Sequence, residues 1–167
     1  APNKYAISVE TDEEYGIVSG DTIAEYLSDI VLTATANYGY HFSSWEDGNV
    51  DNPRIVRVTG DASYRAVFDK NTYRITALSA NEQYGNAFAD SQAEYMDSVI
   101  LYATSNFGYH FAQWNDGNTD NPRTIELTRD TTLIAEFAQT FAGQCGENLY
   151  WKYAEHTLSV YGTGDMY

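Results

Sequence analysis

Along most of the chain, hydrophobic residues occur at every second position. In the stretch 5–9, Tyr5, Ile7 and Val9 fall on one face, and small or polar residues lie between them. The same alternation appears in five further stretches, which are 30–36, 56–58, 64–68, 73–77 and 125–137. Strict alternation that uses β-branched and aromatic residues is typical of antiparallel strands that bury one face. The pattern therefore predicts a mostly β chain.

Two kinds of segment interrupt the predicted strands. The sequences TGDA at 59–62 and TRDT at 128–131 have the composition of turns, and we expect each to form a hairpin between the strands on either side. The sequence TIAEYLSDI at 22–30 is the segment with the most helical character. A short helix and an irregular strand both fit it.

The chain contains an internal repeat. At an offset of 69 residues, roughly half of the positions in 15–68 carry the same residue as their partners. Matched pairs include Tyr15 with Tyr84, Trp45 with Trp114, and Phe68 with Phe137. We therefore predict a first module at 1–69, a second at 70–139, and a separate segment at 140–167. The linker Asp69–Asn71 is very short, so the modules should lie close together with restricted motion.

The composition narrows the possible functions. The chain carries 24 Asp and Glu against 9 Lys and Arg, a net charge of -15, which repels nucleic acid and anionic lipid surfaces. The single cysteine, Cys145, cannot form an intrachain disulfide. No apolar run approaches the roughly 18 residues of a membrane-spanning helix. Because the chain begins at Ala1, we expect a piece of a longer protein, whose signal and anchor lie elsewhere.

The most closely repeated stretch is HFSSWEDGNVDNPR at 41–54, which returns as HFAQWNDGNTDNPR at 110–123. Asp-Gly and Asn-Pro are strong turn signals, so the simplest interpretation is a strand followed by a turn, with Phe42 and Trp45 in the core. Strict alternation would place these two rings on opposite faces. If both are buried, a β-bulge must lie between them.

A calcium site is the first alternative for this stretch. Oxygen ligands alternate as D-x-N-x-D in both copies, which are Asp47, Asn49 and Asp51, and then Asp116, Asn118 and Asp120. The full calcium-loop signature is missing, because its sixth position is Asn52 instead of Gly and its twelfth is Val58 instead of Glu. A bound ion would therefore be held weakly.

A glycan site is the second alternative. Exposed rings near Trp45 and Trp114, flanked by Asp, Asn and Arg, would form a surface for a sugar, and two copies would add avidity. Buried tryptophans would favour a structural role, and exposed rings beside an acidic groove would favour binding.

Catalysis is not expected. The carboxylates of Asp47 and Asp51 lie on one turn, with nothing to separate their pKa values. Cys145 lacks a nearby base in the sequence, although His156 comes later, and His41 and His110 occur singly. We predict no catalytic residue, no metal site and no cofactor.

The order of motifs in each module resembles a known family. The series runs Y-x-I-x-V, Y-G, V-x-L-x-A-T, G-Y-x-F-x-x-W-x-D-G, N-P-R and a closing A-x-F. It resembles the divergent internalin B-type repeat of bacterial surface proteins over about Tyr5–Phe68 and Tyr73–Phe137. The resemblance implies small β-grasp-like modules in tandem arrays that space or present other domains outside the cell. The family has no catalytic residues to carry over.

The last segment resembles a different family. The residues C-G-x-N-L-x-W and T-L-x-V-x-G-x-G-x-M within 145–167 resemble the stretch that opens BspA-like leucine-rich repeat regions of bacterial surface proteins. By its pattern the segment is a hairpin with strands at 149–153 and 158–161 and a turn at 154–156. It is too short to form a repeat array alone, so we expect it to begin a longer array.

Together these features predict two antiparallel β modules and a C-terminal hairpin in a non-enzymatic, cell-surface or secreted bacterial protein. The expected role is that of a spacer or adhesin that presents neighbouring domains. An extracellular glycan or host protein is the alternative partner, and a calcium-stiffened linker is the second alternative. Neither nucleic acid nor membrane insertion is expected.

Overall fold

A computed structural model describes residues 3–90, 92–154 and 156–167. The fold is all β, as the sequence predicts, and these residues contain no helix. None of the described segments is therefore a helix long and apolar enough to span a membrane. The chain divides into two compact units, Ala1–Thr72 and Tyr73–Tyr167.

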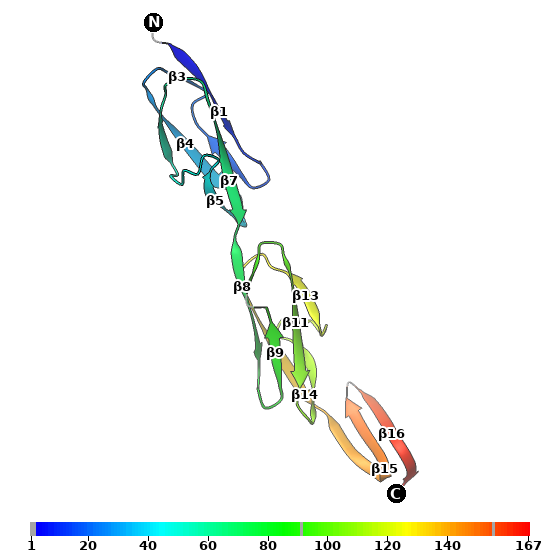
Figure 1. Cartoon of the computed structure of the whole chain (residues 1–167). Coiled ribbons are helices and arrows are strands. Elements are labelled where there is room, and N and C mark those ends of the chain that lie inside the picture. The colour runs from blue at the N-terminus through cyan, green and yellow to red at the C-terminus, as the bar shows by residue number, and fades with distance from the viewer. Residues whose placement is uncertain (1–2, 91, 155) are drawn as a thin grey trace. The chain divides into compact units, whose positions relative to one another are not determined.

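The first unit contains two sheets (Figure 1). One has the strand order β3-β1-β7-β5 and the other has the order β2-β4-β6. The strands are β1 (Lys4–Glu10), β2 (Gly16–Ser19), β3 (Ile23–Glu25), β4 (Asp29–Ala36), β5 (Tyr40–Trp45), β6 (Arg54–Arg57) and β7 (Ala62–Lys70).

A single hydrophobic core lies between the two sheets of the first unit. Leu32 on β4 is fully buried, and Ile7 on β1 and Phe68 on β7 are almost so. These side chains come from alternate positions of their strands, and the residues between them face outward. The period-two pattern of the sequence therefore identifies the buried face correctly, because successive strand residues point to opposite sides of a sheet.

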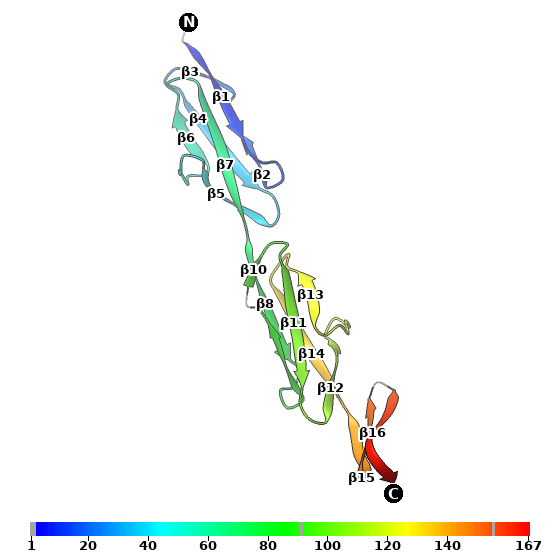
Figure 2. The same cartoon turned by 45° about the vertical axis from the view of Figure 1, so that its right-hand side comes forward.

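The second unit repeats this architecture, and Figure 2 shows its strands from another side. Its sheets have the orders β10-β8-β14-β12 and β13-β11-β9. The strands are β8 (Thr72–Ser79), β9 (Gly85–Ala89), β10 (Gln92–Glu94), β11 (Ser98–Ser105), β12 (Tyr109–Trp114), β13 (Arg123–Glu126) and β14 (Thr131–Gln139). The equivalent core includes Leu101, Trp114, Leu127 and Ala135.

The predicted hairpins at 59–62 and 128–131 are wrong. β6 pairs with β4, and β7 pairs with β1 and β5, so the turn at 59–62 carries the chain from one sheet to the other. The Asp61 carboxylate accepts a hydrogen bond from the N–H of Ala6 at 2.8 Å, which fixes the turn beside β1. Turn residues indicate that a chain reverses, but they do not indicate which strand the next one joins.

Most strand pairs are antiparallel, as expected, but one pair in each unit is not. β1 runs parallel to β7, with Ile7 opposite Ala62 and Val9 opposite Tyr64. β8 and β14 form the same parallel pair in the second unit. The first and last strands of each module therefore lie side by side in the centre of its four-stranded sheet.

The ambiguous stretch 22–30 is an irregular strand and not a helix. It contains β3, a turn and the first residues of β4. Leu27 has a left-handed φ of 61°, and its N–H donates to the carbonyl of Val58 at 2.8 Å. A helix would require that N–H to bond within its own segment, so the tertiary contact decides the conformation.

The glycine of the Tyr-Gly pair, which begins the second strand of each repeat, is required by the packing of the core. Gly16 begins β2 against the ring of Phe68, and a Cβ at this position would overlap that ring and the carbonyl oxygen of Thr35. Gly85 has the same relation to Phe137 in the second unit. A larger residue at either position would force the core apart.

The segment after the second module forms the predicted hairpin, with longer strands than expected. β15 (Phe141–Ala154) pairs antiparallel with β16 (Thr157–Met166). Of the predicted turn at 154–156, Glu155 lies outside the described residues. All of β16 is exposed, so this ribbon has no second layer over it among the described residues.

Candidate functional site

Trp45 ends β5 and is buried in the core. Its side chain is 1% exposed, and the equivalent Trp114 at the end of β12 is 0% exposed. The pairing of β5 with β7 shifts between Phe42 and Ser44, which is the β-bulge that the sequence requires. This shift turns both rings inward, with 5.6 Å between the ring centroids of Phe42 and Trp45. The predicted turn-plus-core arrangement is confirmed.

The loop after β5 folds back over the tryptophan. The N–H of Gly48 donates to the carbonyl of Trp45 at 2.8 Å, and Gly48 has a φ of 84°, which favours glycine. The N–H of Trp45 donates to the carbonyl of Asn49 at 2.7 Å. The indole Nε1 donates to the carbonyl of Asp51 at 2.9 Å. The polar atom of the buried ring is thus satisfied by the loop backbone.

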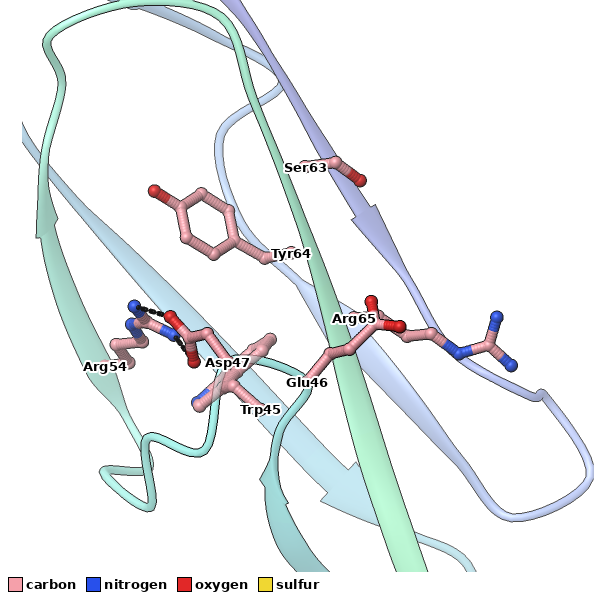
Figure 3. Close-up of a pocket in the computed structure, with 7 residues that line it drawn as sticks. All are labelled: Trp45, Glu46, Asp47, Arg54, Ser63, Tyr64 and Arg65. Carbon is pink, nitrogen blue, oxygen red and sulfur yellow. Dashed lines mark hydrogen bonds and ion pairs between the residues drawn. The ribbon is translucent and has the colours of Figure 1, made fainter.

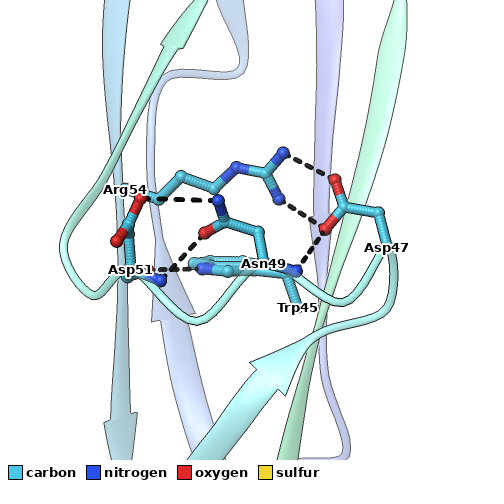
Figure 4. A network of polar contacts seen from close by, with 5 residues as sticks. All are labelled: Trp45, Asp47, Asn49, Asp51 and Arg54. Carbon is cyan, nitrogen blue, oxygen red and sulfur yellow. Dashed lines mark hydrogen bonds and ion pairs between the residues drawn. The ribbon is translucent and has the colours of Figure 1, made fainter.

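The alternating Asp and Asn side chains bond within the same loop (Figure 4). The Asp47 carboxylate accepts from the N–H of Asn49 at 3.2 Å, and the Asn49 side-chain oxygen accepts from the N–H of Asp51 at 2.9 Å. The second copy makes the same bonds through Asp116, Asn118 and Asp120. The D-x-N-x-D spacing is therefore explained by turns in which each side chain bonds the backbone two residues on.

Arg54 at the start of β6 closes the loop from the other side. Its guanidinium forms two hydrogen bonds to Asp47, at 2.8 and 2.6 Å. The guanidinium carbon lies 6.0 Å from the Trp45 ring centroid and 5.0 Å from that of Tyr64. Arg123 and Asp116 form the same bidentate pair in the second unit. Paired geometry of this kind orients both side chains, so the loop is held at both of its ends.

The ion pair also shifts the acidity of its carboxylates. The hydrogen bonds from Arg54 lower the pKa of Asp47 below its ordinary value of 3.8, and Arg123 lowers the pKa of Asp116 in the same way. A carboxyl group whose folded-state pKa is lowered adds stability above its unfolded pKa. That stability is lost as the pH falls through the folded pKa.

Replacing Asp47 with Asn should therefore make the first module less sensitive to acid. We expect wild type to exceed Asp47→Asn in stability above pH 3.8, and the difference to shrink below that pH and vanish as the pH falls through the lowered folded pKa of Asp47. The Asp47 side chain is 53% exposed, so solvent screening limits the effect to about 1 kcal/mol or less. Urea unfolding at a series of pH values measures it. Glu46→Gln, a change in the adjacent carboxylate, is the matched control, and an equal response from it would contradict the prediction.

Asn52 has a structural role that the sequence alone did not reveal. Its side-chain oxygen accepts from the N–H of Ala34 at 3.0 Å, and its Nδ2 donates to the carbonyl of Ala34 at 2.7 Å. Asn52 lies two residues before β6, which pairs with β4. Its side-chain amide therefore bonds β4 at the position where one more residue of β6 would pair. Asn121 does the same for Ala103. The peptide bonds before Pro53 and Pro122 are cis. The only signal in the sequence was the exact repetition of Asn-Pro-Arg.

The profile of the divergent InlB B-repeat domain matches residues 5–72 and 75–141. The chain belongs to this family. The two matched ranges correspond to β1–β7 and β8–β14, and the β15–β16 ribbon lies almost entirely outside them. Comparison with curated proteins and with solved structures gave no match. InlB-type repeats are typical of bacterial surface proteins, so the chain fits a repeat segment of such a protein.

In each InlB B-repeat an arginine occupies the first aspartate of the D-x-N-x-D stretch. Both carboxylate oxygens of Asp47 are bonded to Arg54, and a cation at this position would have to displace the guanidinium. Among the described residues no cluster of three or more His, Cys, Asp or Glu side chains is placed to bind a metal.

A small pocket of about 220 Å³ lies beside this loop in the first InlB B-repeat (Figure 3). Its lining includes Tyr64 and Arg54, whereas Arg65 points to the other side of β7. The buried Trp45 ring presents no open face to a sugar. The second InlB B-repeat has Leu133 where the first has Tyr64, so the tyrosine that lines this pocket is not repeated.

The thiol of Cys145 and the imidazole of His156 lie far apart. Cys145 lies near the open end of the β15–β16 ribbon, where its carbonyl accepts from the N–H of Tyr167 at 2.8 Å. His156 lies at the turn, since Ala154 is opposite Thr157. At about 3.3 Å per strand residue the two are roughly 30 Å apart. His41 and His110 contact the ends of their own repeats instead.

Proposed function

We propose that the chain is a non-enzymatic spacer or adhesin segment of a bacterial cell-surface or secreted protein, which presents neighbouring domains outside the cell. One observation carries the proposal. The most repeated residues of the two modules make their polar contacts with their own module, and both tryptophans are buried. Residues retained in two copies for ligand contact would instead be expected to face solvent.

The net charge supports an extracellular spacer without a nucleic acid or membrane partner. At -15 the surface repels phosphate groups and other anionic surfaces and favours solubility. An acidic surface also disfavours association between copies of the module, which suits a segment that keeps other domains apart.

Thermal unfolding of the chain tests this proposal. The midpoint should be the same in EDTA, in millimolar calcium, and in a set of host and bacterial polysaccharides, because only a ligand of the native state raises it. A higher midpoint in calcium would show that the chain is a calcium-stiffened linker. A rise with one polysaccharide would make the chain a glycan-binding module. Tyr64→Ala, in the pocket of the first repeat, is the variant that should abolish such a glycan response.

We further propose that the β15–β16 ribbon begins a BspA-like leucine-rich repeat region. One face of the ribbon is rich in apolar residues, and two strands alone are marginally stable in water, so a neighbouring repeat would complete it. The residues of that face include Trp151, Tyr153, Leu158 and Val160. Hydrogen exchange tests this: the ribbon amides should exchange much faster than those of β4 and β11. Equal protection would contradict the need for a covering repeat.

A further inference from the structure

The outer face of the sheet β13-β11-β9 in the second module carries large apolar side chains in contact with solvent (Figure 1). Phe88 on β9 and Ile100 and Tyr102 on β11 are each between 44% and 55% exposed. Phe88 lies opposite Tyr102, and their rings are stacked with 5.1 Å between the centroids and 24° between the planes. Ile100 faces the same side as Tyr102, because the two are at alternate positions of one strand. These three residues form the outer patch.

The first module shows that the fold does not require the two aromatic rings of the outer patch. At the offset of 69 residues, Ser19 and Thr33 occupy the positions of Phe88 and Tyr102. They lie opposite each other on β2 and β4, as the rings do on β9 and β11. The same sheet order therefore forms with either pair. Large apolar groups that a fold leaves in water without needing them indicate a contact surface.

The charge beside the outer patch also differs between the modules. In the first module Asp29 lies opposite Arg57, and their side chains are 3.5 Å apart. In the second module Ser98 and Glu126 occupy these positions, so a lone acidic group replaces the ion pair. Among the described residues no basic side chain lies within ion-pair distance of Glu126. Glu126 is a diagonal neighbour of Ile100 across the β11–β13 pair, at about 7–8 Å.

We propose that the outer patch and Glu126 bind an extended, basic segment of a partner protein, in which Lys or Arg alternates with apolar residues. The faces of aromatic rings attract a cationic side chain, and a nearby carboxylate pairs with it. An extended segment presents every second residue to the same side, so alternation places its cations and apolar groups in separate rows.

The charge of the chain favours this occupant over the others. At -15 the chain repels nucleic acid and a second copy of itself, and it attracts a cationic segment. A neutral glycan would gain nothing from the Glu126 carboxylate. The proposed contact goes beyond the spacer role, because a spacer needs no surface that differs between its repeats.

A nuclear magnetic resonance titration of the whole isotope-labelled chain tests the outer patch. The probe is a short acetylated and amidated peptide in which Lys alternates with Val. The amide signals of β9, β11 and β13 should shift, while those of the equivalent strands β2, β4 and β6 stay in place. A peptide with Glu instead of Lys should shift neither set. Added salt should weaken the binding, because it screens exposed charges.

Exchanging residues between the modules separates the patch from the overall charge. Phe88→Ser with Tyr102→Thr installs the residues of the first module, leaves the net charge unchanged and should weaken peptide binding by about tenfold or more. Glu126→Arg should weaken it to a similar extent, because it places a cation beside the patch. Glu82→Arg makes the same charge change in the loop before β9 and is the matched control, with binding within about twofold of wild type. Dispersed amide signals verify that each variant is folded.

Several results would overturn the basic partner. The absence of shifts with the Lys peptide would remove it, and equal shifts in both modules would reduce it to general attraction toward an acidic chain. Unchanged binding by the Phe88→Ser, Tyr102→Thr variant would show that the rings do not contribute. Shifts of the same amides on raising the protein concentration alone would assign the patch to a second copy. Shifts with a neutral polysaccharide but not with the peptide would assign it to a glycan.

Discussion

Trp45→Ala should unfold the first module and leave the second one folded. Removing a fully buried tryptophan costs about 3–5 kcal/mol. A module of about 70 residues has a total stability of roughly 3–10 kcal/mol at 0.05–0.15 kcal/mol per residue, so the loss is comparable to the whole. Calorimetry should show that the transition of the first module is lost or moved far down in temperature, while the transition of the second module is retained.

Two further variants make this prediction specific. Trp114→Ala should give the reciprocal result, because Trp114 has the same burial and the same indole hydrogen bond. Trp45→Phe keeps a ring in the core but loses the Nε1 donor to the carbonyl of Asp51, so it should cost about 1–3 kcal/mol. If Trp45→Ala melted like wild type, the buried tryptophan would not be the centre of the module, and the structural role assigned to the repeated stretch would fail.

Asn52→Ala should produce the second largest effect. The substitution leaves the N–H and the carbonyl of Ala34 without their partner at a partly buried position, which costs about 1–3 kcal/mol for each buried group left unsatisfied. The free energy of unfolding from urea titration should fall by about 2 kcal/mol or more. Hydrogen exchange gives a local readout, because the Ala34 amide should lose its protection while the Leu32 amide keeps it.

Asn52→Asp separates the shape of the side chain from its hydrogen bonding. The carboxylate can still accept from the N–H of Ala34, but its second oxygen would face the Ala34 carbonyl without a hydrogen, so it should destabilise the module as Ala does. Val50→Ala, in the same loop and 69% exposed in wild type, should stay within about 0.5 kcal/mol of wild type. An Asn52 variant as stable as Val50→Ala would show that the amide does not support β4.

Several features of the repeat arise from local pattern, and the sequence predicted them correctly. Alternation identified the strands and their buried faces, because side-chain direction in a strand has a period of two. Phe42 and Trp45 are both large and apolar at positions of opposite parity, so burying both required the bulge that occurs between Phe42 and Ser44. The repetition of these residues also identified the family over both modules.

The candidate site was predicted only in outline. The turn and the buried tryptophan of the repeated stretch were expected, but the partners of its polar residues were not. From the sequence, the Asp47 carboxylate could equally have bound a metal ion. The folded loop brings Arg54 beside it, and the guanidinium donates a hydrogen bond to each carboxylate oxygen. The Asn52 amide bonds Ala34, which lies 18 residues away, and no local rule places those two groups together.

Tertiary structure alone decided how the strands are joined. Local patterns specify where the chain turns and which face is buried, whereas the pairing of β1 with β7 depends on groups far apart in sequence. The Asp61 carboxylate that bonds Ala6 and the Asn71 side chain that bonds His41 act over 55 and 30 residues, respectively. Such contacts exist only after the strands have packed. The sequence by itself therefore determined the strands, the repeat and the core, and the folded structure determined the sheet order and the loop network.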